Sequence, residues 1–139
     1  MTVADSSALV ELYADEDGAD VVRRVPVHVV SAVARVEVPA ALWRKARTGG
    51  LSVENATILV AAFVADWRDP DGRFVPVGLW VPVLEQAASS AVVHGLRAYD
   101  AVQLSCALAA RAADPAVDSL CFDAELREAA GREGFSLVA

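Results

Sequence analysis

The chain has 139 residues, 55% of them hydrophobic, and its 19 acidic and 12 basic side chains give a net charge of −7. This length suits a single domain spanning residues 1–139, and the hydrophobic content can supply a sizeable core. The negative charge excludes the broad basic surface of a generic nucleic-acid binder, so a nucleic acid would have to be recognised in a defined groove.

Strand-like and helix-like segments alternate through the first half of the chain. Dense β-branched residues predict a strand that ends at Val30, although Pro26 weakens its start. Ser31 and Ser52 can each cap a helix, and Pro39 should kink the first of these two helices. The predicted elements are strands at Thr2–Ala4 and Val25–Val30, helices at Ser7–Tyr13 and Ser31–Arg47, and a further helix from Ser52.

The same alternation continues in the second half. A turn at residues 69–72 separates the preceding helix from the next strand, and Gly95 ends a later helix. A strongly apolar helix follows and stops at the Asp114-Pro115 pair. The predicted elements are strands at Phe74–Leu79, Leu120–Phe122 and Ser136–Val138, and helices at Val83–His94, Tyr99–Ala113 and Glu125–Ala130.

This order of elements predicts an α/β fold. Strands that alternate with long helices imply crossover connections and a parallel sheet, whose strands are buried on both faces. We therefore expect a three-layer sandwich, with a central, mostly parallel sheet of four to five strands flanked by helices. In such sheets the functional site forms beyond the carboxyl ends of the strands.

Four acidic residues stand in or beside segments that otherwise look like core: Asp5, Glu37, Asp100 and Asp123. A carboxylate is almost never fully buried unless something pairs with it, and a divalent metal ion is a suitable partner for several carboxylates together. Asp5 and Asp123 both follow their strands and belong at the carboxyl edge. Asp118 precedes its strand. Five residues at about 3.3 Å each place it roughly 16 Å from Asp123, at the opposite edge of the sheet, so we exclude it from the acidic cluster.

Each acid also has a simpler interpretation. Asp5 and Asp123 can cap the helices that follow them, because Asp is a preferred N-cap residue. Asp100 with Gln103 has the spacing of a capping box. Capping and metal binding are compatible, since a carboxylate at a helix start can also face a metal ion.

Several neighbouring side chains have two interpretations as well. Glu37 could lie on a partly exposed helix face beside Arg35 or Arg44. Ser7 could hold Asp5 or contact a substrate phosphate, and it could equally be an ordinary serine of the first helical turn. Arg97 could contact phosphate or form a surface ion pair. The tryptophans are expected in the core or at an interface: Trp43, Trp67 and Trp80.

The sequence also carries an expectation about cellular location. It contains no run of about 18 uncharged apolar residues, so we expect no membrane-spanning helix. Asp5 comes almost at once, without a basic leader before an apolar block, which argues against a signal peptide. Cys106 and Cys121 lie in apolar segments at a spacing typical of neither a disulfide framework nor a zinc site. We therefore expect a cytoplasmic protein with two reduced, buried thiols.

Blocks of sequence around the four acids occur in a characteristic order: residues 5–10, 31–42, 96–104, 122–126 and 129–134. In this order and spacing the chain resembles the PIN-domain ribonucleases of the toxin (VapC) type, over essentially its whole length. Two positions depart from the family pattern. Glu11 stands where the family often has a basic residue, and Cys121 stands where it often has Thr or Ser, so a hydrogen bond to Asp123 could be missing.

The resemblance implies a PIN-like sandwich with the activity of a metal-dependent endoribonuclease. Asp5, Glu37, Asp100 and Asp123 would be the catalytic residues and would bind Mg²⁺ (or Mn²⁺), with Ser7 and Arg97 near the substrate. A metal-activated water would hydrolyse RNA phosphodiester bonds, leaving 5′-phosphate and 3′-hydroxyl ends. The family pattern further implies a small antitoxin protein as partner, a homodimer and a toxin–antitoxin hetero-oligomer.

Other functions remain open at this point. The same fold could be a non-catalytic PIN-like module that binds RNA or protein and uses its acids only as caps and contacts. A phosphoryl-transfer domain is disfavoured, because it would need a second Asp at position 7 or an essential lysine, and the only lysine is Lys45 on a helix. DNA also remains possible as the substrate.

Overall fold

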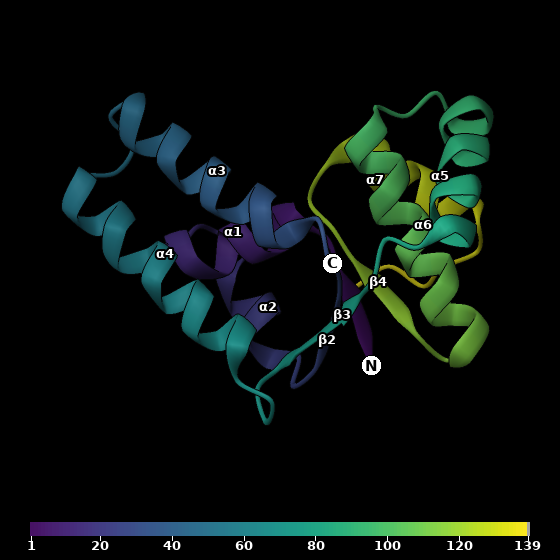
Figure 1. The fold of residues 1–139 in the computed structure, drawn as a ribbon, viewed down its shortest axis with the longest axis horizontal. Helices are drawn as coiled ribbons and strands as arrows, with labels where there is room; N and C mark the ends of the chain where they lie inside the picture. Colours follow the sequence, from purple (N-terminus) through teal and green to yellow (C-terminus); the bar gives the residue numbers. More distant parts are fainter. Residues whose placement is uncertain (139) are drawn as a thin grey trace.

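The computed structural model describes residues 1–138, which form a parallel four-stranded sheet with helices on both faces (Figure 1). The strand order is β3-β2-β1-β4, and Val3 in the middle of β1 lies beside Val29 of β2 and Ser119 of β4. The predicted α/β sandwich is therefore confirmed. The strands are β1 (Thr2–Ala4), β2 (His28–Ser31), β3 (Phe74–Val77) and β4 (Asp118–Leu120).

The helices divide into two layers, one on each face of the sheet (Figure 1). One core lies under the first four helices and includes Leu9, Leu42 and Phe63, and a second core under the last three includes Leu104 and Leu126. These layers bury the strands from both sides, as parallel sheets require. The helices are α1 (Ser6–Ala14), α2 (Ala19–Arg24), α3 (Ala34–Arg47), α4 (Val53–Arg68), α5 (Val81–His94), α6 (Ala98–Ala113) and α7 (Ala124–Arg132).

Some predicted boundaries were wrong. Helix α2 was not predicted, and it occupies the residues before β2, which starts only at His28. Ser31 does not cap α3, because it is still in β2 beside Val77, and its Oγ accepts a hydrogen bond from the Val33 amide at 3.2 Å. The predicted last strand is reduced to one bridge between Ser119 and Leu137. Strand limits depend on the partners available across the sheet, which local sequence does not specify.

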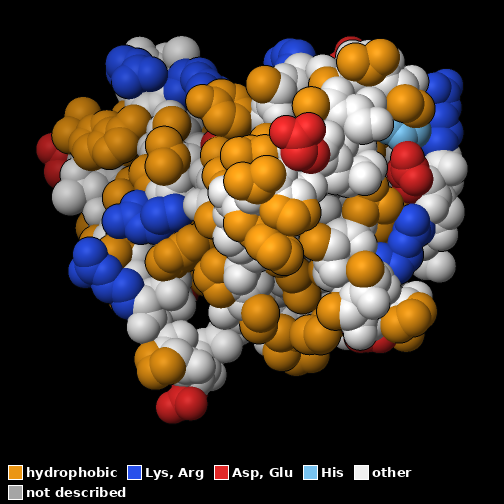
Figure 2. Space-filling model, turned by 45° about the vertical axis from the view of Figure 1, so that its right-hand side comes forward, with side chains coloured by type: hydrophobic (Ala, Val, Ile, Leu, Met, Phe, Trp, Pro, Cys, Tyr) orange, Lys and Arg blue, Asp and Glu red, His pale blue; other side chains and the backbone are white. Residues whose placement is uncertain are grey.

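The tryptophans differ in their surroundings. Trp67 of α4 is half-buried and packs against Phe63 and Phe74 at the edge of the core. Trp80, which immediately precedes α5, is 65% exposed. Figure 2 shows apolar side chains gathered on the side of the molecule where α5 and α6 lie. The outcome for the three tryptophans therefore differs: Trp67 packs against the core, Trp43 is half-buried, and Trp80 lies on an apolar surface.

Cys106 and Cys121 are both buried and both free. Within residues 1–138, the helices lack the combination of length and apolar character that crossing a bilayer requires.

Candidate active site

Two of the four acids lie together at the carboxyl edge of the sheet. Strand β1 ends at Ala4, which is in register with Leu120 at the end of β4. Asp5 follows directly, and its backbone amide donates to the Leu120 carbonyl at 3.3 Å. Asp123 comes three residues after β4, at the start of α7. Asp118 pairs with Thr2 at the opposite edge, so the structure also separates it from the other acids.

Asp5 is a nearly buried carboxylate, with 7% of the residue exposed. It caps α1, since its Oδ1 accepts the Ala8 amide at 3.0 Å, and Ser7 Oγ lies 2.7 and 2.8 Å from its two oxygens. Burial raises the pKa of Asp5 to about 7 against these hydrogen bonds, and the negative charge of Asp123 adds to the rise. Ser7 therefore holds Asp5, and a cation near Asp5 would favour its ionised form.

Asp100 and Asp123 share a cation. Both Nε and Nη2 of Arg97 donate to Asp100 Oδ2 at 3.3 Å, and Nη2 lies 3.7 Å from Asp123 Oδ2. Even so, partial burial, followed by the charge of Asp123, raises the pKa of Asp100. The acids are thus close enough to repel one another, and the guanidinium group of Arg97 partly compensates.

The alternative interpretation of Asp100 and Gln103 as a capping box does not hold. The N-cap of α6 is Arg97, so Asp100 is the third residue inside the helix. Gln103, one turn later, is 5% exposed and points across the site. Its Nε2 donates to Glu37 Oε1 and to Ser6 Oγ, both at 2.7 Å, and it thereby links α6 to α3 and α1.

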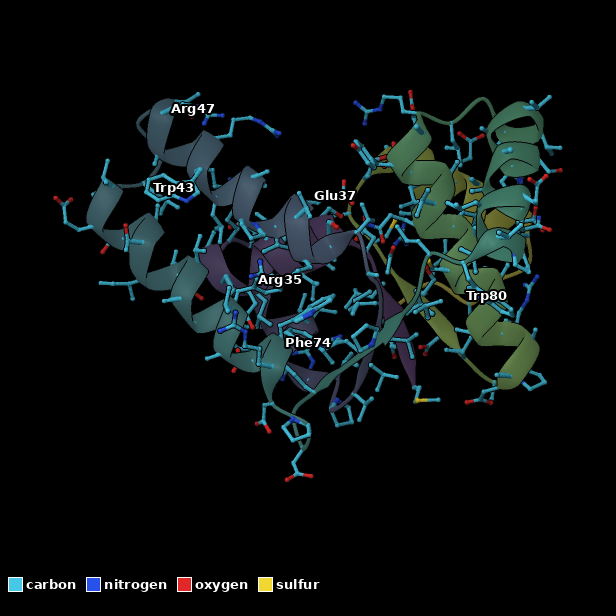
Figure 3. The ribbon with its side chains drawn as sticks, viewed as in Figure 1. Arg35, Glu37, Trp43, Arg47, Phe74 and Trp80 are labelled. Atoms are coloured by element: carbon cyan, nitrogen blue, oxygen red, sulfur yellow. The ribbon has the colours of Figure 1, made fainter. Side chains whose placement is uncertain are left out.

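Glu37 is held by neutral donors rather than by arginine. Ser6 Oγ donates to the same Oε1 at 3.1 Å, and no ion pair of Glu37 with Arg35 or Arg44 occurs within residues 1–138. Figure 3 shows Glu37 on the side of α3 that faces the second helical layer, with Arg35 on the other side. Sequence reasoning missed Gln103 as a site residue. The available signal was an amide side chain on the apolar face of a helix, one turn after Asp100.

Asp123 caps α7, with Oδ1 accepting the Leu126 amide at 3.0 Å. Cys121 donates to the backbone carbonyl of Asp123 at 3.5 Å and not to its carboxylate. Burial raises the pKa of Cys121 to about 12, and the charges of Asp5 and Asp123 add to this effect, so the thiol stays protonated. Ser7 Oγ, which holds Asp5, also accepts the Phe122 amide at 3.0 Å, so one hydroxyl connects the two segments that carry Asp5 and Asp123.

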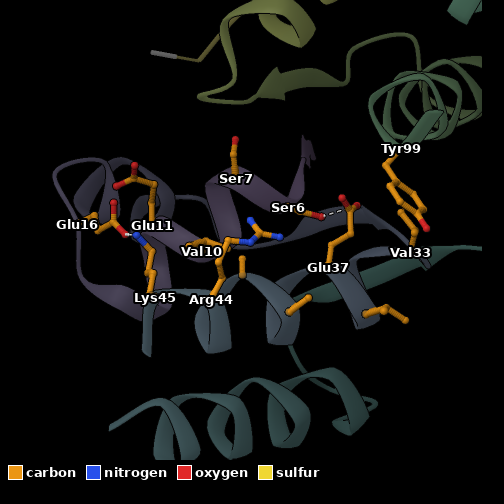
Figure 4. Close-up of a pocket in the computed structure, with 13 residues that line it drawn as sticks. Ser6, Ser7, Val10, Glu11, Glu16, Val33, Glu37, Arg44, Lys45 and Tyr99 are labelled. Atoms are coloured by element: carbon orange, nitrogen blue, oxygen red, sulfur yellow. Dashed lines mark hydrogen bonds and ion pairs between the residues drawn. The ribbon is translucent and has the colours of Figure 1, made fainter. Parts of the chain in front are cut away.

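A groove of about 550 Å³ opens beside Glu37, between α1 and α3 (Figure 4). Ser6, Ser7 and Glu37 lie in its wall at the acidic end, and Tyr99 stands at its rim. Arg44 projects into the middle of the groove. At the far end Lys45 pairs with Glu16. Of the four acids, Glu37 alone lines this groove, which is largely apolar along its length but also carries Glu11, Glu16, Arg44 and Lys45.

The donor set fits a hard divalent cation. Asp5, Glu37, Asp100 and Asp123 supply only carboxylate oxygens, which Mg²⁺ and Mn²⁺ prefer. Two of these acids already share the positive charge of Arg97. The four acids are not preassembled: within residues 1–138 no three Asp, Glu, His or Cys side chains converge on a point that could hold a metal ion. Metal binding would therefore require side-chain rotation and displacement of Arg97.

The family assignment follows from the sequence itself. The sequence model of the family described as PIN domain matches residues 2–132. The chain belongs to the PIN domain family. No curated protein sequence is similar enough to count as a match.

Two solved structures share the fold of this PIN domain. PAE2754 from Pyrobaculum aerophilum has a TM-score of 0.66 at 22% identity, covering 99% of this chain and 83% of that one. VapC20 from Mycobacterium tuberculosis, a toxin that cleaves the sarcin-ricin loop, has a TM-score of 0.64 at 16% identity, covering 98% of this chain and 97% of that one. At these identities the likeness is one of fold.

Proposed function

We propose that this PIN domain, taken as residues 1–139, is a metal-dependent endoribonuclease that hydrolyses RNA phosphodiester bonds. The observation that carries the proposal is the group of carboxylates at the carboxyl edge of the parallel sheet, where burial, with the negative charge of Asp123 adding to it, raises the pKa of both Asp5 and Asp100. Negative charge of this density is unfavourable without a cation, which supports a role in metal-assisted chemistry rather than in helix capping alone.

In this proposal Asp5, Asp100, Glu37 and Asp123 hold Mg²⁺ or Mn²⁺. When bound, such an ion polarises a phosphate and makes a water molecule more acidic. Ser7 keeps Asp5 oriented through its short hydrogen bonds to both carboxylate oxygens. Gln103 occupies one oxygen of Glu37 and leaves Oε2 free for a water molecule or a metal ion.

Arg97 and the groove provide the contacts for RNA. Arg97 is 76% exposed in its side chain, so after leaving the carboxylates it can reach a phosphate beside them. Arg44 in the groove offers a second phosphate contact, and Tyr99, which is 62% exposed, offers a face for base stacking. Single-stranded or looped RNA suits this groove better than a duplex, because its bases can turn outward.

We further propose that the protein acts as the toxin of a toxin–antitoxin pair. The fold shared with VapC20, itself a toxin that cleaves the sarcin-ricin loop, supports this assignment and an RNA loop as substrate. A small antitoxin would then cover the groove, and the two proteins would form a hetero-oligomer built on a toxin homodimer. An RNA substrate and two free, buried cysteines suit a cytoplasmic location.

The test is cleavage of a stem-loop RNA by the purified protein, freed of any antitoxin, with Mn²⁺, with Mg²⁺ or with excess EDTA. We expect cleavage only with metal, and we expect Asp100→Asn to abolish it. Asp118→Asn is the matched control, because it makes the same change at the opposite edge of the sheet.

Cleavage that is equal in excess chelator would refute the proposal. RNA that is bound tightly but left uncut under every metal condition would instead identify a non-catalytic binding module. Measuring binding by fluorescence anisotropy alongside cleavage distinguishes these outcomes.

A further inference from the structure

Gly18 lies against the aromatic ring of Phe122, the residue that precedes Asp123. It is buried at the N-cap of α2, with φ −83° and ψ −5°, in the right-handed helical region that any residue can adopt. A Cβ atom at this position would lie 2.4 Å from Cζ of Phe122 and 2.8 and 2.9 Å from two further ring atoms. Gly18 is therefore required for this close contact and not for its backbone conformation, unlike Gly95, whose φ is +64°.

The backbone of Phe122 reaches the carboxylates through Ser7. The Phe122 amide donates to Ser7 Oγ at 3.0 Å, and that hydroxyl lies 2.7 and 2.8 Å from the two oxygens of Asp5. A hydroxyl group has one hydrogen, so accepting from Phe122 leaves that hydrogen directed at the Asp5 carboxylate. Asp123, the next residue, caps α7. The position of the Phe122 backbone therefore determines both the orientation of the Ser7 hydroxyl and the position of Asp123.

Glu11 holds the loop that carries Gly18. Its Oε2 accepts the Gly18 amide at 3.0 Å, and its backbone carbonyl accepts the Glu16 amide at 3.1 Å. Figure 4 shows Glu11 at the end of the groove opposite Glu37. No part of the proposed reaction uses Glu11, and these hydrogen bonds tie the loop between α1 and α2 to α1.

We propose that Gly18 and Glu11 are positioning residues for the metal site. Glu11 fixes Gly18, and the ring of Phe122 packs on Gly18. The Phe122 amide then directs the Ser7 hydroxyl toward Asp5. The inference rests on the proposed metal-dependent function, because the contacts hold carboxylates in the arrangement from which they would bind a metal ion. Removing the hydrogen-bond partners of metal ligands commonly weakens metal binding about 10- to 100-fold.

An added methyl group at Gly18 should shift Phe122 without unfolding the protein. Phe122 is half-buried at the margin of the core under the first four helices, so its ring can turn toward solvent when Ala is placed beside it. That movement draws the Phe122 amide away from Ser7, whose hydroxyl is then free to rotate away from Asp5. A smaller side chain at position 122 would remove the collision and restore the arrangement.

The first test measures amide hydrogen exchange by NMR in EDTA, where no metal ion contributes. In Gly18→Ala the Phe122 amide should exchange about tenfold faster than in the wild type, whereas the Val29 amide in the middle of the sheet should not change. Glu11→Leu should have the same effect, because it removes the acceptor of the Gly18 amide. Glu11→Gln is its matched control, since the side-chain amide oxygen can still accept this hydrogen bond.

The second test measures the affinity for Mn²⁺ by calorimetry. Gly18→Ala should weaken binding about tenfold, and the same change in the Phe122→Leu background should cost less than about twofold, because the smaller side chain leaves room for the methyl group. Gly131→Ala in α7 is the control, since a Cβ atom there would lie 3.6 Å from Leu137, which is an ordinary contact. The control should leave both the affinity and the Phe122 amide unchanged.

A Phe122 amide that exchanges at the wild-type rate in Gly18→Ala would overturn the proposal, as would an equal loss of Mn²⁺ affinity in both backgrounds. If Gly18→Ala does not fold, as judged by circular dichroism, the contrast between Glu11→Leu and Glu11→Gln decides in its place. Equal Mn²⁺ binding by the wild type and Gly18→Ala would overturn this inference alone. A wild-type protein that binds no Mn²⁺ would instead refute the metal-dependent nuclease, and the positioning role with it.

Discussion

Replacing Asp5 by Asn should stabilise the metal-free protein above neutral pH while removing its response to metal. Asp5 is nearly buried, and its pKa is raised to about 7 from a model-peptide value of 3.8. Asn has nearly the same shape, can still accept the Ala8 amide as an N-cap, and never carries a charge. The substitution therefore separates the electrostatic effect of the carboxylate from its structural role.

The direction of the expected change in stability follows from proton linkage. Between pH 3.8 and 7 the folded state holds a proton on Asp5 that the unfolded state releases. The stability that this proton contributes is fully present below pH 3.8 and is lost as pH rises through 7. Relative to a side chain that cannot ionise, the raised pKa of Asp5 lowers the free energy of unfolding of the wild type by about 4 kcal/mol at pH 8. Near pH 4.5 the loss is about 1 kcal/mol. We expect the free energy of unfolding of Asp5→Asn to exceed that of the wild type by up to these amounts at the two pH values.

The assay is urea denaturation followed by circular dichroism at pH 8 and pH 4.5, in EDTA, with Mn²⁺-dependent melting temperatures measured separately. Asp123→Asn is the matched control, because it makes the same change at the N-cap of α7 on a side chain that is 32% exposed. The free energy of unfolding of the control should change by less than about 1 kcal/mol, which is the size of a single capping effect. Mn²⁺ should raise the melting temperature of the wild type but not that of Asp5→Asn.

Two results would refute this reasoning. One is an Asp5→Asn protein less stable than the wild type at pH 8 in EDTA, which would mean that the carboxylate is favourable as it stands. The other is an equal gain at both pH values, which would show that the effect does not come from ionisation. A Mn²⁺ response that Asp5→Asn retains in full would remove Asp5 from the proposed metal ligands.

Three further predictions concern other residues. Arg97→Gln frees the two carboxylates that share the guanidinium group. Because an exposed ion pair is weak, the affinity for Mn²⁺ measured by calorimetry should rise about two- to fivefold. An unchanged affinity would contradict the proposal that metal binding displaces Arg97. Gln103→Leu removes the donor that orients Glu37 and should weaken Mn²⁺ binding about tenfold. The control is Ser105→Ala on the same helix, which removes a hydrogen bond to the Val83 carbonyl and should lower stability without changing the affinity for Mn²⁺. Burial, reinforced by the charge of Arg73, lowers the pKa of His28 to about 4, so the protein should lose up to about 3 kcal/mol of stability as pH falls from 6.5 to 4. Because Asp5 acts in the opposite direction over this range, the loss should be measured in Asp5→Asn and should disappear when His28→Phe is added.

The sequence predicted the acids that follow strands better than those within helices. Asp5 and Asp123 were placed at one edge because each comes after a short apolar strand, and parallel strands end at the same edge. For Glu37, the alternative of an arginine partner does not hold. Neither Arg35 nor Arg44 pairs with it, and its partners come from Ser6 and Gln103, which lie 31 and 66 residues away in the chain.

The tertiary structure also changed the interpretation of Gln103 and Trp80. The spacing of Gln103 from Asp100 is compatible with a local capping box, but the amide instead reaches across to another helix. Trp80 was expected in the core or at an interface, and only its 65% exposure in the folded chain rules out the core. Both residues have local patterns that fit more than one environment.

Hydrophobic periodicity, caps and turn residues thus determined the order of strands and helices, because these signals act over a few neighbouring residues. The same signals predicted the sandwich, since alternating elements can bury both faces of a parallel sheet only in this way. Only the tertiary structure decided which side chains meet across helices. Contacts such as Gln103 with Glu37, or Arg97 with Asp123, depend on how whole elements pack, and no stretch of sequence contains both partners.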